Sequence, residues 1–192
     1  MKLDLGSGPN PEPGFVGVDI AGASERVMKF DLCSGHDWPL RDCCADELRS
    51  SHFIEHIPAC NIHLPGRQQD ALFFFFEQAW RVARPGAKFT LIWPALQSSN
   101  AFRDPTHRRF IPLGIVDYLS CNGREHLGVT HYGVHCNWVL RHRRDLMSVF
   151  DGSADTESDD TLTRYPERWN QIIEHQAVVY KEPLESSDSA PA

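Results

Sequence analysis

The chain has 192 residues, a formal net charge of -7, and apolar and charged fractions of 41% and 23%. That length suits one domain with a substantial core, and the acidic balance argues against a protein that coats nucleic acid through bulk charge. No signal peptide is evident, and the longest apolar block, 71–76, is far too short to span a bilayer, so we expect no membrane contact. Six cysteines without a C-x-x-C pair favour free thiols and a cytoplasmic location.

The first quarter of the chain alternates short apolar runs with turns. These runs predict strands at 2–5, 15–20, 27–32 and 46–51. Three prolines between residues 9 and 14 leave no room for a full crossover helix, so we expect a loop there. A loop or single helical turn is expected at 52–57, and a linker at 61–66.

The strongest helix signal in the chain covers residues 68–84. Apolar residues recur there at three- and four-residue spacing, which is typical of a helix with one buried face. Four consecutive phenylalanines, 73–76, also place aromatic surface off that face and would suit a homodimer contact. Pro85-Gly86 ends the helix, and residues 88–93 predict the next strand.

The rest of the chain is less regular. Residues 95–145 form a loop-rich region that we expect to be functional, with one helix near 111–120. The remaining elements are expected as strands at 137–142 and 177–180, a helix at 166–174, an acidic insert at 151–160 and a disordered tail at 185–192. Residues 1–184 are expected to form a single domain.

This order of elements predicts an open α/β sheet. Ligands of such sheets bind off the carboxyl ends of the strands. The turn Gly6-Ser7-Gly8 and the acids Asp19 and Asp31 all fall at carboxyl ends. Glycines let the backbone approach a ligand, and a carboxylate accepts hydrogen bonds from ribose hydroxyls, so the pattern predicts a site for an adenosine-bearing ligand.

Four segments in order resemble a known family, the small class I S-adenosylmethionine-dependent methyltransferases of the type 11 kind. The segments are 3–10, 17–20, 50–57 and 79–87, and the resemblance covers roughly residues 2–110. It implies a Rossmann-like open, mostly parallel sheet with a late antiparallel strand, here reduced at the N-terminus. It also implies S-adenosyl-L-methionine as the cofactor.

The resemblance further implies which residues bind that cofactor. The glycine turn would pass beside its methionine part, Asp4 would help to hold the ammonium group, and Asp19 would bind the ribose. Asp31 with Leu32 resembles the pair that meets the adenine. The full set is Asp4, Gly6, Ser7, Gly8, Asp19, Ile20, Asp31, Leu32 and Ser51. Ordinary roles compete with these: a tight turn for the glycines, a helix cap for Asp19 and a solvated loop acid for Asp31.

Methyl transfer is an in-line displacement, in which the protein aligns the two reactants, excludes water and removes a proton where the acceptor needs it. A histidine or a carboxylate would remove that proton. The catalytic candidates are His52, His56, Asp104 and His107, with Glu55 beside them. The segment 103–109 carries three arginines and is expected to rim the pocket, where they would meet a phosphate or carboxylate of the acceptor. A loop folded on its own salt bridges is the competing interpretation.

Two histidine pairs, His52 with His56 and His131 with His135, have the spacing of a helical metal pair. Only the first has an acid nearby, Glu55. Proline and glycine neighbours argue against a long helix at either place, so the sequence predicts no metal site.

We therefore expect an enzyme that methylates an oxygen or nitrogen of a small-molecule, sugar or nucleotide-linked acceptor. A nucleic-acid methyltransferase is one alternative, although the acidic balance and the lack of an Asn-Pro-Pro-Tyr-like motif count against it. A binding or scaffold protein that keeps the fold without catalysis is another. A nicotinamide-dependent dehydrogenase fits worst, because the glycine turn does not match G-x-G-x-x-G.

Overall fold

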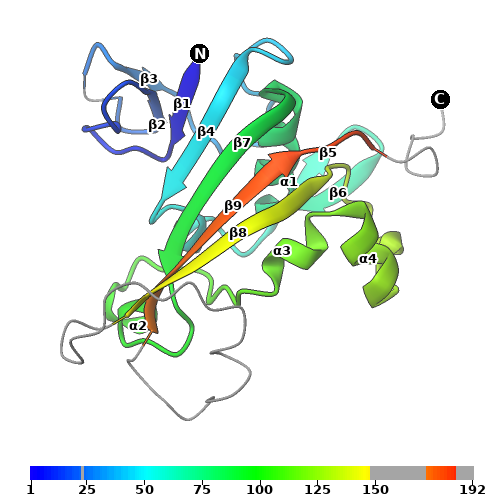
Figure 1. The fold of residues 1–192 in the computed structure, drawn as a ribbon. Helices are drawn as coiled ribbons and strands as arrows, with labels where there is room; N and C mark the ends of the chain where they lie inside the picture. The colour runs from blue at the N-terminus through cyan, green and yellow to red at the C-terminus, as the bar shows by residue number, and fades with distance from the viewer. Residues whose placement is uncertain (23, 148–171, 185–192) are drawn as a thin grey trace.

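The computed structural model describes residues 1–22, 24–147 and 172–184, and these are organised around one seven-stranded sheet (Figure 1). In spatial order the strands are β3 (Val27–Lys29), β2 (Val16–Asp19), β1 (Lys2–Leu5), β4 (Ala45–Ser51), β7 (Ala83–Pro94), β9 (Ile172–Lys181) and β8 (Trp138–Met147). The first five run parallel, and β9 runs antiparallel to both of its neighbours. The predicted open, mostly parallel sheet with a late antiparallel strand is confirmed.

The amino-terminal strands follow one another without a helix in the described residues between them. The expected loop at 9–14 is present and leads from β1 to β2. β1 lies between β2 and β4, so the chain order reverses direction across the sheet at this point. Connections leave β1 and β4 toward opposite edges, and in open α/β sheets ligands bind at the carboxyl ends of the strands at such a point.

The helix α1 (Ala71–Val82) packs its apolar face against the sheet. Three of the four phenylalanines are buried, and the Phe76 ring lies 6.2 Å from that of Phe89 on β7. The fourth, Phe73, is half-buried and stacks on Tyr118 at 6.5 Å between ring centroids. All four rings therefore pack within the chain, and the phenylalanine run gives no support to a homodimer.

The helix is shorter than the predicted 68–84. Asp70 caps it, because its Oδ1 accepts a hydrogen bond from the Leu72 N–H at 2.9 Å. After Val82 the chain turns directly into β7, which begins at Ala83 and not at the predicted residue 88. The helix therefore ends before Pro85-Gly86.

Residues 61–70 form a hairpin of β5 (Asn61–Leu64) and β6 (Arg67–Asp70), so the predicted linker at 61–66 is wrong. Pro65 and Gly66 make the turn, where Gly66 has a φ of 77°. All four residues of β6 are polar, so the sequence shows no apolar pattern that would predict this strand. Gln69, for example, is buried and donates a hydrogen bond to Glu77 Oε1 at 2.9 Å. A contact with a later helix fixes this strand, and no local pattern encodes such a contact.

The predicted loop region contains three short helices, α2 (Asn100–Arg103), α3 (Ile115–Tyr118) and α4 (Cys121–Leu127), and two 3₁₀ turns lie at η1 (Ile54–His56) and η2 (Thr130–Tyr132). Only α3 forms within the helix predicted at 111–120. The sequence does not predict α4, which begins at a Ser120 cap and ends at Gly128 with a φ of 68°. None of the described helices is long and apolar enough to cross a membrane.

The helix predicted at 166–174 is wrong in its last three residues, which belong to the long strand β9. Residues 172–174 belong to β9, and 166–171 lie outside the described residues. β9 pairs on both edges, with β7 and with β8, and this double pairing extends the predicted strands at 177–180 and 137–142. The insert predicted at 151–160 and the tail at 185–192 also lie outside the described residues.

Candidate functional site

The glycine turn follows β1 at the carboxyl edge of the sheet. Gly6 and Gly8 have φ values of 71° and 57°, in the left-handed region that favours glycine. A side chain at Gly6 would place its Cβ 2.1 Å from the ring of Phe53, whereas one at Gly8 would meet nothing within 4 Å. The turn therefore packs closely against the Phe53 ring at Gly6, whereas Gly8 faces open space.

Asp19 ties the glycine turn to the end of β2. Its Oδ2 accepts a hydrogen bond from the Gly8 N–H at 2.9 Å, and its Oδ1 accepts one from the Ala21 N–H at 2.8 Å. A carboxylate offers about four lone-pair positions, so roughly two remain for a ligand. The neighbouring Ile20 is 64% exposed and gives this edge an apolar surface.

The Asp4 carboxylate makes its contacts within the protein. It is buried, accepts a hydrogen bond from the Glu12 N–H at 2.9 Å and pairs with Arg49 at 3.3 Å. These contacts hold the proline-rich loop against β1, where a crossover helix would otherwise pack. The predicted contact of Asp4 with a cofactor ammonium group stays a prediction and would need an intervening water.

The other predicted cofactor residues take different positions. Asp31 is exposed and accepts a hydrogen bond from the Cys33 N–H at 2.8 Å. Leu32 is buried in the core, so its side chain points away from the surface that Asp31 presents. Ser7 and Ser51 are half-buried, at the turn and at the last position of β4.

His52 follows β4 in a left-handed conformation, with a φ of 52°. Its Nδ1 lies 3.3 Å from Glu55 Oε1, and its Nε2 lies 3.0 Å from Glu174 Oε1. The carboxylates of Glu174 and Glu55 beside the ring raise the pKa of His52 to about 9, so the ring is a cation at neutral pH. The sequence gives no signal for Glu174, because β9 brings it to His52 from more than a hundred residues away.

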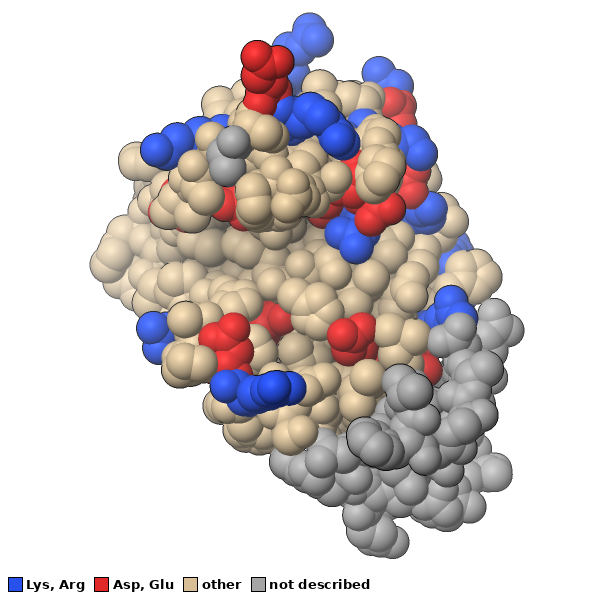
Figure 2. Space-filling model, turned by 90° about the vertical axis from the view of Figure 1, so that its left-hand side faces the viewer, with Lys and Arg blue, Asp and Glu red and all other residues tan. Residues whose placement is uncertain are grey.

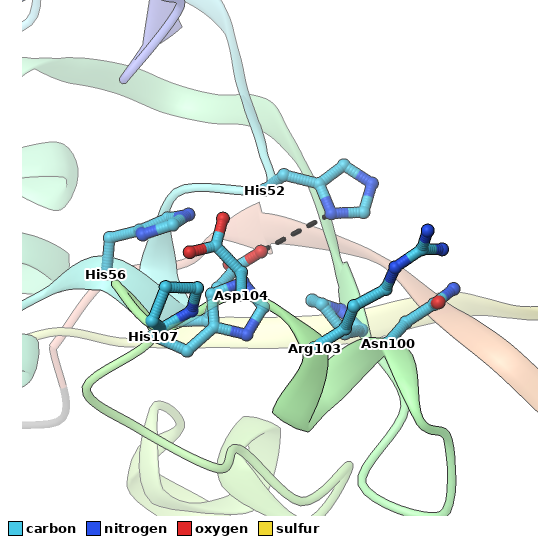
Figure 3. A pocket seen from close by; sticks show the side chains of 9 residues that line it. His52, His56, Asn100, Arg103, Asp104 and His107 are labelled. Atoms are coloured by element: carbon cyan, nitrogen blue, oxygen red, sulfur yellow. Dashed lines mark ion pairs between the residues drawn. The ribbon is translucent and has the colours of Figure 1, made fainter.

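A pocket of about 550 Å³ opens next to His52 (Figure 3). It is lined by His52, Glu55, His56, Pro94, Asn100, Arg103, Asp104, Pro105 and His107. The structure thus brings together all four predicted catalytic candidates, from η1, the end of β4 and the loop after α2. Figure 3 shows His56 and His107 on one side of this group, with Arg103 and Asn100 on the other.

Hydrogen bonds orient the rings of His56 and His107. Nδ1 of His107 lies 2.8 Å from the carbonyl oxygen of Ala101, and Nδ1 of His56 lies 3.1 Å from Thr106 Oγ1. The Thr106 hydroxyl in turn donates to Asp104 Oδ1 at 2.6 Å. Hydrogen bonds from Thr106 hold the pKa of Asp104 below its usual range, so this side chain is an ionised carboxylate that accepts hydrogen bonds.

Two of the three arginines in 103–109 each fit a different one of the two interpretations of that segment. Arg103 lines the pocket, as expected for acceptor binding. Arg109 is mostly buried, donates to the Ile57 carbonyl at 3.0 Å and pairs with Asp70 at 3.0 Å, so it holds the loop. Arg141 lies beside Gly86, near the opposite end of β7 from this loop.

Figure 2 views the molecule from the side on which the arrowheads of β4 and β7 lie in Figure 1. A hollowed band of mostly uncharged surface crosses this face between two charged rims, and acidic side chains lie along its lower side. The charged side chains on this face therefore lie along the edges of the band.

Neither models of known families nor curated proteins match the sequence. Solved structures do match the fold. A SAM-dependent methyltransferase from Archaeoglobus fulgidus is 18% identical, with 94% of this chain and 85% of that chain covered and a TM-score of 0.58. One from Mesorhizobium loti is 11% identical, with 94% and 90% covered and a TM-score of 0.52.

A third similar structure is the complex of a methyltransferase with the Trm112 methyltransferase activator from Haloferax volcanii. It is 14% identical, covers 96% of this chain and 82% of that chain, and has a TM-score of 0.51. At these identities the likeness concerns the fold. The strand order, the antiparallel β9 and these similar structures together show that the chain has the fold of the class I S-adenosylmethionine-dependent methyltransferases.

Proposed function

We propose that this protein is an S-adenosylmethionine-dependent methyltransferase that acts on an oxygen or nitrogen atom of a small-molecule, sugar or nucleotide-linked acceptor. One observation carries this proposal: the glycine turn and the histidine-lined pocket lie at the same edge of one sheet. His52 joins them, because it directly follows Ser51 of β4 and lines the pocket. A donor held at the turn and an acceptor held in the pocket would meet beside His52.

The residues of the turn suit the cofactor. Asp19 would bind the ribose hydroxyls through the lone pairs that its two backbone hydrogen bonds leave over. Ile20 would lie against the adenine, and exposed Asp31 would accept from the adenine amino group. Leu32 would take part through its backbone, since its side chain is buried. When bound, S-adenosylmethionine supplies the methyl group on a sulfonium centre.

The pocket supplies the means to orient the acceptor and to receive its proton. His52 is a cation paired with two carboxylates, so it does not act as a base and would instead help to shape the site. His56 and His107 each use Nδ1 within the fold, which leaves the Nε2 lone pair to receive a proton. Arg103 would bind a phosphate or carboxylate of the acceptor.

A nucleic-acid acceptor has less support. Arg109 is used within the fold, and Arg141 pairs with Glu182 near the far end of β7. These two groups therefore do not join Arg103 in one continuous basic track, which a polyanion would need.

Calorimetric titration with S-adenosylhomocysteine tests the proposal. The wild-type protein is expected to bind saturably, and Asp19→Ala is expected to weaken binding at least tenfold, about 1.4 kcal/mol. Asp117→Ala is the matched control, because Asp117 is exposed on α3 and far along the chain from the turn. A folded wild-type protein that binds no S-adenosylhomocysteine would favour the scaffold alternative, and binding of NAD alone would refute the proposal.

A further inference from the structure

Three metal-ligating side chains meet inside the pocket. Glu55, His56 and His107 each offer one ligand atom, and these atoms lie within 4.8 Å of one another. We propose that these three residues bind a divalent transition-metal ion, with an open coordination position that faces the pocket (Figure 3). The sequence points to a different pair, His52 with His56, because the fold and not the local spacing brings His107 to His56.

Glu55 is the first reason for this assignment. It is only 2% exposed, and neither of its carboxylate oxygens accepts a hydrogen bond from the described residues. Its one ion pair there is with His52, at 3.3 Å and marked by the dashed line in Figure 3. A buried carboxylate without hydrogen bonds is costly, and a coordinated cation would offset that cost.

The state of the His107 ring is the second reason. Its Nδ1 lies 2.8 Å from the Ala101 carbonyl oxygen, which can only accept. Nδ1 therefore carries the proton of the neutral ring, and the lone pair is on Nε2. A backbone carbonyl that fixes the ring in this way is the usual support for a metal-binding histidine.

His56 is held in the same state by a chain of two hydrogen bonds. Thr106 has one hydroxyl proton, and it donates that proton to Asp104 Oδ1 at 2.6 Å. Toward His56 the same oxygen can therefore only accept, so Nδ1 of His56 carries the proton at a distance of 3.1 Å. The His56 lone pair is then also on Nε2.

The backbone keeps the three ligands together. The carbonyl oxygen of Glu55 accepts hydrogen bonds from the N–H groups of Arg108 and Arg109, at 2.8 and 3.0 Å. These bonds fasten the loop that carries His107 to η1. Ligand atoms about 2.1 Å from a tetrahedral zinc ion are about 3.4 Å apart, so the groups must close by roughly an ångström on binding.

The ligand types decide which ion is expected. Two imidazoles and one carboxylate suit Zn²⁺ and its transition-metal neighbours, whereas Mg²⁺ and Ca²⁺ prefer oxygen ligands throughout. His52 is not among the three clustered ligands, because its two ring nitrogens face the carboxylates of Glu55 and Glu174, at 3.3 and 3.0 Å.

Metal binding is independent of the function proposed above, but any part in methyl transfer rests on that function. An ion in this position would bind an acceptor hydroxyl and lower its pKa, and so would take over the proton-handling role of the two histidines. The geometry therefore assigns His56 and His107 to ligand binding when the metal is present.

Titration with Co²⁺ tests the site, because cobalt replaces zinc and has visible absorption bands. Chelator-treated protein without a polyhistidine tag is expected to bind one equivalent, with visible bands and no thiolate-to-cobalt charge-transfer band. Glu55→Gln and His107→Ala are expected to weaken binding at least tenfold. His126→Ala, which removes an exposed imidazole on α4, is the matched control and is expected to bind like wild type.

Several outcomes would overturn the proposal: no saturable binding by wild type, a thiolate charge-transfer band, or equal binding by all three variants. Thermal unfolding of each metal-free variant checks its fold, and His107→Ala alone decides if Glu55→Gln does not fold. S-adenosylhomocysteine titration of the same wild-type sample separates the two proposals. Cobalt binding without S-adenosylhomocysteine binding refutes only the proposed function, and the reverse result refutes only the metal site.

Discussion

Gly6 is the most tightly constrained residue of the glycine turn. Its φ of 71° is unfavourable for any residue with a side chain, and the Phe53 ring occupies the space that a Cβ would need. Phe53 in turn packs against Phe75 of α1, with 5.4 Å between ring centroids. The turn is therefore fixed to the main core, which keeps its backbone in one position before any ligand binds.

Gly6→Ala is expected to reduce the free energy of unfolding by about 2–5 kcal/mol, from backbone strain and overpacking together. Gly86→Ala is the matched control. Gly86 has nearly the same φ, 74°, but open space around it, so only the backbone strain of about 1–2 kcal/mol is expected. Urea unfolding measures both values, and equal losses in the two variants would show that Phe53 does not confine the turn.

Much of the candidate site could be predicted residue by residue. The glycines, Asp19 and His52 lie at or next to strand ends, which short apolar runs mark in the sequence. The other three catalytic candidates lie in the segments that follow β4 and β7. The contact of His52 with Glu174 could not be predicted, because it depends on which strand lies beside β7. The burial of Leu32 was missed for a similar reason, since Trp38 folds back on it and donates to its carbonyl at 3.2 Å.

At the scale of elements, the pairing of β8 with β9 contains a buried polar pair. Asp145 and His175 are directly opposite in the ladder, and Asp145 Oδ1 lies 2.8 Å from His175 Nδ1. Both side chains are 1% exposed, and Arg143 also pairs with Asp145 at 3.0 Å. Burial raises the pKa of Asp145, but the contacts with His175 and Arg143 together outweigh it and hold the pKa below its usual range.

This pair predicts a pH dependence of stability. Because the folded-state pKa of Asp145 is depressed, the carboxylate stabilises the fold above the ordinary pKa of about 4. That contribution is lost as the pH falls from about 4 through the folded-state pKa. Asp145→Asn is expected to lose about 1–3 kcal/mol at pH 7 and to show a flatter acid slope.

Urea unfolding at a series of pH values measures both effects. Asp117→Asn, at an exposed position on α3, is the control and is expected to match the wild-type profile. If the acid slope of Asp145→Asn runs parallel to that of wild type, another carboxylate is responsible for the pH dependence.

The elements that the sequence predicts correctly are those with a local apolar pattern. β1, β2 and α1 are of this kind, although α1 is shortened by its Asp70 cap. The hairpin of β5 and β6 was missed because buried hydrogen bonds, not apolar residues, fix its second strand. The middle of β8, residues 141–145, is also polar, and it is held as a strand by its register with β9.

For the molecule as a whole, the reduced amino-terminal half leaves the glycine turn without a helix behind it among the described residues. Asp4, Arg49 and Glu12 form a polar network in that place, with Arg49 3.3 Å from Asp4 and 3.6 Å from Glu12. The turn is thereby supported from β4, the same strand that leads to His52. In the proposed function, the donor side and the acceptor side would be joined through this one strand, as a methyl transfer between them would need.

A crystal structure with bound S-adenosylhomocysteine tests this arrangement most directly. We expect the ribose hydroxyls at the Asp19 carboxylate, the methionine part along Gly6-Ser7-Gly8, and the sulfur directed at the pocket beside His52. A ligand bound away from the glycine turn, or with its sulfur turned away from the pocket, would contradict the proposal that the turn and the pocket are two halves of one methyl-transfer site.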